Sequence, residues 1–182
     1  MLAETHQTIR KADHLIFRTP TAGDSPEVHA LLLDSGGMEI NSRQCYLLLC
    51  EHFQSTCVVA ENDGDIIGFI SAYIPPDRHD TLFIWQIVVI EALRGRGVAK
   101  RLLRHLLSRP NLKRIRYVEA MMSPSNEEAQ PLFGALAKQC NCSLDEMMTF
   151  PANFFGEKNR GQGNLIRVGP INSVSKTLIG RS

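Results

Sequence analysis

The chain has 182 residues, of which 43% are hydrophobic, and its 20 Lys and Arg nearly balance its 19 Asp and Glu to give a net charge of +1. This balance argues against nucleic-acid binding, which usually depends on a basic excess, and the apolar content is too high for a disordered chain. No apolar run approaches the roughly 18 residues that span a bilayer, and the N-terminal residues lack the pattern of a signal peptide. We therefore expect a soluble, cytoplasmic protein without nucleic-acid or membrane partners.

The N-terminal half alternates between short strand-like runs and helical stripes. The expected elements are a strand at residues 15–17, helices that begin near residues 25 and 43, and strands at residues 57–60 and 66–73. Asp24 before Pro26 is typical of a helix start, because the side chain can cap the helix and proline fits its first turn. The sequence Asn62-Asp63-Gly64-Asp65 between the two later strands predicts a β-hairpin turn.

The C-terminal half continues the alternation. The expected elements are strands at residues 81–90, 115–121 and 165–168, and helices that begin near residues 98 and 126. The strand at residues 81–90 is almost entirely apolar, which predicts burial on both faces at the centre of a sheet. Pro131 lies well inside the last expected helix and should kink it. Alternating strands and helices indicate an α/β or α+β protein.

The length suits one domain with a sizeable core. We expect an N-terminal extension at residues 1–14, a single domain at residues 15–170 and a flexible C-terminal tail at residues 171–182. The five cysteines are odd in number and include no Cys-x-x-Cys pair, which favours reduced thiols in a reducing compartment and no metal site.

The segment that carries chemistry runs from Trp85 to Ala99: an apolar strand, a short turn, and two glycines that open a helix. Gly95 and Gly97 allow the backbone to turn with positive φ and to approach a ligand closely. The N-terminus of the following helix favours an anion such as a pyrophosphate, and Arg94 and Arg96 could add charge-assisted bonds. A plain strand-to-helix turn is the alternative, since a glycine pair alone is weak evidence and the Rossmann and Walker patterns are absent.

Two motifs narrow this choice. Arg94-x-x-Gly97-x-Ala99 resembles the acetyl-CoA pyrophosphate loop of the GNAT superfamily of N-acetyltransferases, and Asn126-x-x-Ala129-x-x-Leu132-Phe133 resembles the superfamily's second cofactor-contacting helix. The resemblance implies a mixed, mostly antiparallel central sheet flanked by helices, with acetyl-CoA as co-substrate. The residues that it implies for cofactor binding are Ile87, Val88, Val89, Arg94, Gly95, Arg96, Gly97, Val98, Ala99 and Asn126.

Longer runs are similar to one family within that superfamily, the diaminobutyrate acetyltransferases of ectoine biosynthesis. The runs include residues 69–78 (Phe-Ile-Ser-Ala-Tyr-Ile-Pro-Pro-Asp-Arg), residues 80–86 and residues 166–170, and the resemblance covers residues 17–170. It implies transfer of an acetyl group from acetyl-CoA to the 4-amino group of L-2,4-diaminobutyrate. The product is the precursor of the osmoprotectant ectoine. The family also suggests a homodimer.

Acetyl transfer needs a neutral amine, so a proton must be accepted, and the departing thiolate must be stabilised. Glu39 is the first candidate for holding or deprotonating the amine and Glu119 the second, with a solvated surface acid as the alternative for both. Many GNAT enzymes use a tyrosine on the second cofactor helix for the leaving group, but Phe133 stands there. Tyr46 could substitute, unless it packs in the core. Trp85 is expected to wall the substrate site, with core packing again the alternative.

Several substrate-side positions depart from the family pattern. Gln44, also assigned to substrate binding, aligns with a tyrosine, and Arg160 and Gly163 align with a histidine and a glutamate. If that alignment holds, a substrate-facing acid has been lost. A GNAT enzyme for another small diamine or amino acid therefore remains an alternative, as does a non-catalytic acyl-CoA-binding module.

Overall fold

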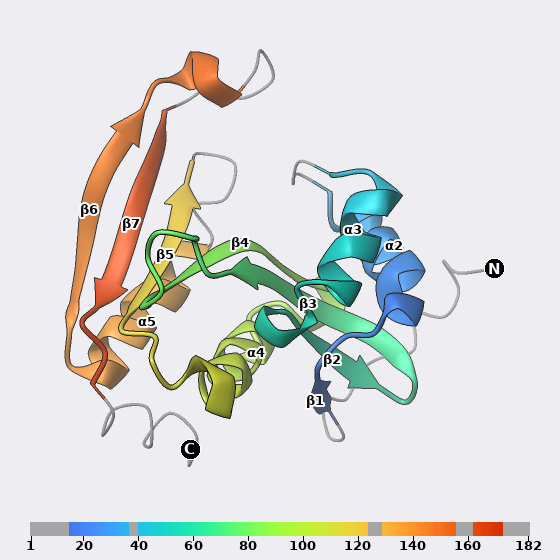
Figure 1. Cartoon of the computed structure of the whole chain (residues 1–182). Helices are drawn as coiled ribbons and strands as arrows, with labels where there is room; N and C mark the ends of the chain where they lie inside the picture. Colours follow the sequence, from blue (N-terminus) through green and yellow to red (C-terminus); the bar gives the residue numbers. More distant parts are fainter. Residues whose placement is uncertain (1–14, 37–39, 124–128, 156–161, 173–182) are drawn as a thin grey trace. The chain divides into compact units, whose positions relative to one another are not determined.

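The computed structural model describes residues 15–36, 40–123, 129–155 and 162–172 (Figure 1). These residues form two compact units. The first unit comprises the described residues up to Ser71 together with Gln86–His105, and the second comprises Ala72–Trp85 and the described residues from Leu106 onward. The strands form a seven-stranded sheet in the order β1-β2-β3-β4-β5-β7-β6. The expected extension, at residues 1–14, lies outside the described residues.

The first unit begins with three antiparallel strands. β1 (Ile16–Arg18) pairs with β2 (Val58–Asn62), and β2 pairs with β3 (Asp65–Tyr73). The turn between β2 and β3 holds Asp63 at φ 53° and Gly64 at φ 94°. Two successive residues with positive φ are the signature of the tight hairpin turn that asparagine, aspartate and glycine favour. The predicted β-hairpin is confirmed.

Two helices of the first unit pack against each other, α2 (Ser25–Ser35) and α3 (Arg43–Glu51). The α3 N-cap is Ser42, whose hydroxyl accepts a hydrogen bond from the Cys45 N–H at 3.3 Å. Both helices begin close to the predicted residues, but the expected cap of α2 is wrong: the Asp24 side chain makes no capping hydrogen bond, because its carboxylate is bound by Arg18. The apolar residues on the inward face of α2 are fully or almost fully buried. These are Val28, Leu31 and Leu32.

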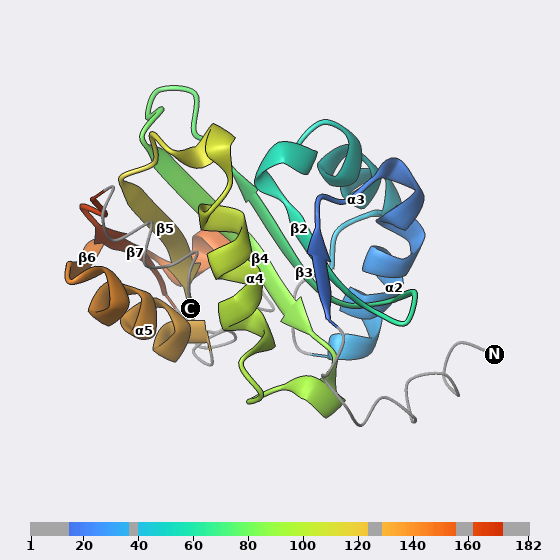
Figure 2. The same ribbon diagram turned by 90° about the horizontal axis from the view of Figure 1, so that it is seen from below.

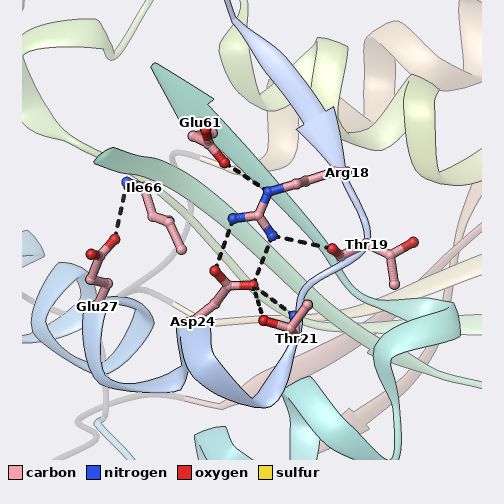
Figure 3. Close-up of polar contacts among 7 residues, drawn as sticks. All are labelled: Arg18, Thr19, Thr21, Asp24, Glu27, Glu61 and Ile66. Carbon is pink, nitrogen blue, oxygen red and sulfur yellow. Dashed lines mark hydrogen bonds and ion pairs between the residues drawn. The ribbon is translucent and has the colours of Figure 1, made fainter. Parts of the chain in front are cut away.

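An arginine joins β1, β2 and the start of α2 (Figure 3). The guanidinium of Arg18 donates two hydrogen bonds of 2.8 Å to the carboxylate of Asp24 and one of 2.7 Å to that of Glu61. The hydrogen bond from Arg18 holds the pKa of the Asp24 carboxyl below its ordinary value, and the backbone N–H of Thr21 assists at 2.6 Å. This cluster fixes the entry into α2.

The central strand β4 (Thr81–Val89) is followed by α4 (Val98–Leu107). The prediction that this strand is buried on both faces is wrong. One face is buried, whereas Phe83 and Ile87 are half-buried and Trp85 is 46% exposed. A strand places successive side chains on opposite faces, so these three residues share one face of β4, and their side chains are only partly buried. The buried face consists of Leu82, Ile84, Gln86 and Val88.

In the second unit β4 pairs in parallel with β5 (Tyr117–Met122), β5 pairs antiparallel with β7 (Gly163–Gly169), and β7 pairs antiparallel with β6 (Ser143–Phe150). α5 (Gln130–Cys140) packs against β6 and β7 (Figure 2). The parallel β4–β5 pair makes the sheet mixed, as predicted. Short 3₁₀ turns lie at Ala22–Asp24, Gln54–Thr56, Glu91–Leu93, Pro110–Leu112 and Ala152–Phe155.

Two further expectations for the second unit need correction. α5 begins at Gln130, so Pro131 lies in its first turn, where a proline removes no helical hydrogen bond and causes no kink. The expected tail from residue 171 starts with a fixed residue: Ile171 is 2% exposed, and its N–H donates to the carbonyl of Arg116 at 2.7 Å. Residues 173–182 lie outside the described part of the chain.

Candidate functional site

The glycine turn before α4 leaves room for a ligand. Gly95 and Gly97 have φ of 73° and 79°, and a Cβ built on either would meet no atom of the protein within 4 Å. The turn opens directly into α4, whose first backbone N–H groups have no partner within the helix and carry partial positive charge. Positive φ, open space and a helix N-terminus together fit the pyrophosphate of acetyl-CoA.

The glycine turn is flanked by two buried apolar side chains, and Arg94 at its start is held by hydrogen bonds. Leu93 and Val98 are buried. The Arg94 guanidinium donates to the carbonyl of Val89 at 3.3 Å through Nε and to the carbonyl of Ser35 at 2.8 Å through Nη2. The sequence suggested that Arg94 bonds to the phosphates, and the structure adds a scaffolding contact to the ends of β4 and α2.

The position of α4 depends on a glycine in β3. A Cβ on Gly68 would lie 3.0 Å from Cδ1 of Leu102 and 3.3 Å from the carbonyl oxygen of Val88. Only a residue without a side chain therefore lets Leu102 of α4 approach β3 this closely. The sequence alone gave no sign of this role for Gly68, because a glycine inside an apolar strand does not reveal which element approaches it.

The basic face of α4 is only partly available to an anion. Lys100 is exposed, whereas the guanidinium of Arg101 lies over the ring of Phe17, 4.8 Å from its centroid. A cation over an aromatic ring is held there by the ring's negative face. The three strand residues assigned to the pantetheine arm lie at the end of β4: Ile87 is half-buried, and Val88 and Val89 are buried.

Tyr46 is a core residue of the first unit. Its side chain is 0% exposed, its ring packs edge-on against that of His29 at 5.7 Å, and its hydroxyl accepts a hydrogen bond from the Asn41 N–H at 3.1 Å. Burial and a backbone partner for the hydroxyl favour the core-packing alternative over the expected catalytic role.

The other substrate-side residues are spread over both units. Gln44 lies on α3 and is exposed to solvent, and Trp85 lies on the partly open face of β4. The exposure of Trp85 argues against the alternative that this side chain packs in the core. Gly163 is buried at the start of β7 and contributes no side chain. Three assigned residues fall outside the described parts of the chain: Glu39, Asn126 and Arg160.

Glu119 is not placed to accept a proton. Its side chain is 0% exposed, and Nη1 of Arg78 lies 2.6 Å from each of its two oxygens. Arg167 adds bonds from Nε at 2.8 Å and from Nη2 at 2.6 Å to Oε1. Two guanidinium groups therefore occupy the lone pairs that a base would use. The sequence signal for this cluster was a glutamate inside an apolar strand, which required a charged partner that sequence could not identify.

Phe133 is 1% exposed in α5 and has no hydroxyl to offer a leaving group. The five cysteines are free, and burial raises the pKa of Cys50 to about 12. A thiol with a raised pKa is a poor nucleophile, so Cys50 is a packing residue. Among the described residues, no group of His, Cys, Asp and Glu could hold a metal ion, and no helix there is long and apolar enough to cross a membrane.

Comparison with known proteins identifies the class to which this fold and glycine turn belong. The sequence profile described as "Acetyltransferase (GNAT) family" matches residues 26–137. The chain belongs to this family.

Its similarity to particular members extends over most of its length. It is 39% identical to the L-2,4-diaminobutyric acid acetyltransferase of Shouchella clausii over 159 residues, which cover 87% of this chain and 89% of that protein. It is 36% identical to the enzyme of the same name from Marinococcus halophilus, with 87% and 92% covered. The solved structure of diaminobutyrate acetyltransferase EctA from Paenibacillus lautus, in complex with L-2,4-diaminobutyric acid and coenzyme A, matches with a TM-score of 0.83 at 34% identity, covering 87% of this chain and 96% of that one.

Proposed function

We propose that this protein transfers the acetyl group of acetyl-CoA to the 4-amino group of L-2,4-diaminobutyrate. The observation that carries the proposal is the similarity to a solved diaminobutyrate acetyltransferase bound to diaminobutyrate and coenzyme A, over 87% of the chain. The open glycine turn at Gly95 and Gly97 supports it, because it provides the cradle that an acyl-CoA requires.

In this proposal the neutral 4-amino group attacks the thioester carbonyl and the carbon–sulfur bond breaks. The proton that the nitrogen gives up protonates the departing thiolate, so coenzyme A leaves as its thiol. The backbone of Ile87, Val88 and Val89 holds the pantetheine arm, and an N–H near Val88 or Val89 stabilises the developing oxyanion. Asn126 and residues 94–99 complete the cofactor site. Glu39 and Gln44 hold the substrate amine, and Trp85 offers its exposed ring to the ammonium.

One observation favours a substrate other than diaminobutyrate. Gly163, which aligns with a substrate-facing glutamate of the family, begins β7 without any side chain. An enzyme that has lost this acid could act on a different small diamine or amino acid. An assay of thiol release with diaminobutyrate, ornithine, putrescine and lysine separates the two. The highest kcat/KM with diaminobutyrate supports the proposal, and a preference for any of the others contradicts it.

We also infer a cytoplasmic homodimer whose product serves as the precursor of ectoine, an osmoprotectant. The family resemblance supports both inferences. Light scattering coupled to size exclusion tests the first: a mass near twice the 20.4 kDa of the chain is expected, and a monomer at micromolar concentration contradicts it.

A further inference from the structure

The ion cluster of the second unit carries more positive than negative charge. Glu119 is the only carboxylate bonded to the guanidinium groups of Arg78 and Arg167 among the described residues, so one positive charge is uncompensated there. Asp145 lies opposite Arg167 on β6, but its described hydrogen bond comes from the hydroxyl of Ser143, at 2.6 Å. An uncompensated charge beside a buried carboxylate is costly unless an anion or solvent meets it.

The two arginines differ in the donors that they keep available. Arg167 uses both Nε and Nη2 on Glu119, and its guanidinium lies over the ring of Tyr117, 4.8 Å from the centroid. Arg78 uses only Nη1, and its Nε and Nη2 donate no hydrogen bond to the described residues. The Arg78 side chain is also 41% exposed, against 25% for Arg167. A guanidinium fixed at one nitrogen and open at the others suits a second, incoming carboxylate.

The cluster lies on the same sheet face as Trp85. Phe83 of β4 is the register partner of Glu119 of β5, and Trp85 is two residues further along β4, on the same side. Two residues of a strand advance by about 6.6 Å. In L-2,4-diaminobutyrate four bonds separate the carboxyl carbon from the terminal nitrogen, an extended length of about 5 Å. A substrate whose carboxylate meets this cluster can therefore extend its amine along β4 toward the exposed ring of Trp85.

We propose that Arg78, held by Glu119, binds the carboxylate of the amino-acid substrate and so selects a diamino acid over a simple diamine. The proposal rests on the function proposed above and extends it. Glu119 then acts as a positioning residue: it fixes one nitrogen of Arg78 and leaves the others directed at the ligand. Arg167 balances the charge of Glu119, so the free charge belongs to Arg78.

The test compares diaminobutyrate with 1,3-diaminopropane, which has the same two amines and spacing but no carboxylate. Steady-state kinetics are measured for the wild type, for Arg78→Gln and for Arg114→Gln. Arg114 is an exposed arginine of the same unit and is the control for loss of one charge. If diaminopropane turns over too slowly, its inhibition constant against diaminobutyrate replaces its KM.

We expect Arg78→Gln to raise the KM for diaminobutyrate by roughly tenfold to a hundredfold, the range for one lost charged hydrogen bond, and to leave the value for diaminopropane unchanged. Arg114→Gln should alter neither. Equal losses with both amines, or no loss with either, would show that the cluster only fastens the loop before β4 and would overturn the proposal. A wild type that turns over neither amine contradicts the proposed function instead. Thermal unfolding of Arg78→Gln confirms that the variant is folded.

Discussion

The side chain of Arg94 donates a hydrogen bond of 2.8 Å to the carbonyl of Ser35, the last residue of α2, across 59 residues of sequence. With its second bond to the carbonyl of Val89, it joins the end of a helix to the end of β4 immediately before the glycine turn. Arg94, which the sequence assigns to cofactor binding, therefore also fixes the backbone on which the glycine turn begins.

Replacing Arg94 with alanine should weaken both the fold and cofactor binding. Two carbonyls lose a charged donor, one in a part-buried and one in an exposed setting, so we expect the free energy of unfolding to fall by about 1 kcal/mol. We also expect a several-fold higher KM for acetyl-CoA. Urea unfolding and steady-state kinetics measure the two effects. If stability is unchanged while the KM rises, Arg94 serves the cofactor alone and the scaffolding role is contradicted.

Gly97→Ala should raise the KM for acetyl-CoA much more than it lowers stability. The new Cβ meets no protein atom, so the fold bears only the cost of positive φ, about 1 kcal/mol, whereas the methyl group projects into the space expected for the pyrophosphate. Gly97→Glu adds a negative charge there and should abolish cofactor binding.

Gly64→Ala is the matched control for this change. Gly64 also has positive φ, and a Cβ added to it would meet no atom within 4 Å, but it lies in the β2–β3 turn. It should lose similar stability with no change in KM. Identical kinetic effects of Gly97→Ala and Gly64→Ala would mean that the glycine turn does not contact the cofactor.

Tyr46→Phe distinguishes a core residue from a catalytic acid. The change leaves the Asn41 N–H without its partner, the buried Tyr46 hydroxyl, so we expect a loss of about 1–2 kcal/mol in unfolding free energy with kcat within twofold of the wild type. Chemical denaturation and turnover at saturating substrate are the measurements. A hundredfold loss of kcat with unchanged stability would restore the catalytic role suggested by sequence.

The Arg18–Asp24 pair predicts a specific dependence of stability on pH. Because Arg18 lowers the pKa of Asp24 in the folded state, the pair's contribution is fully present above the unfolded value of 3.8 and is lost as the pH falls through the lower folded value. Asp24→Asn should therefore be less stable than the wild type by about 1 kcal/mol at pH 7, a difference that disappears in acid.

Thermal melts at pH 7, 5 and 3 follow this difference. The exposed Asp77 provides the control substitution, Asp77→Asn, which should match the wild type at all three values. A gap between wild type and Asp24→Asn that stays constant down to pH 3 would show that the pair stabilises the fold by packing and not by charge.

Much of the fold could be predicted because local patterns carry it. The hairpin turn at Asp63 and Gly64 and the helix cap at Ser42 are encoded by residues that adjoin the structure they form. β6 could not be predicted, because most of its side chains are exposed and its residues, with two acids and two methionines, show no alternation. The apolar run at residues 81–90 predicts burial on both faces, which is wrong. Composition alone cannot reveal that the Trp85 side chain is exposed to solvent.

The candidate site also has features that the sequence could predict and features that it could not. The glycine turn could be predicted, because positive φ favours glycine and the helix that follows shows a regular apolar stripe. The partners of Glu119 could not, because Arg78 and Arg167 are 41 and 48 residues away along the chain and meet it only through strand pairing. The role of Tyr46 depends on burial, which a single aromatic residue in a helix does not disclose.

The position of the new amide tests most directly whether the protein transfers acetyl from acetyl-CoA to the 4-amino group of diaminobutyrate. The purified protein is incubated with acetyl-CoA carrying carbon-13 in its acetyl carbonyl and with L-2,4-diaminobutyrate, and the product is examined by proton–carbon correlation spectroscopy. We predict a correlation from the labelled carbonyl to the protons on carbon 4, with one free thiol released per amide formed. A correlation to the proton on carbon 2, or no labelled amide while other amines are acetylated, would contradict the account.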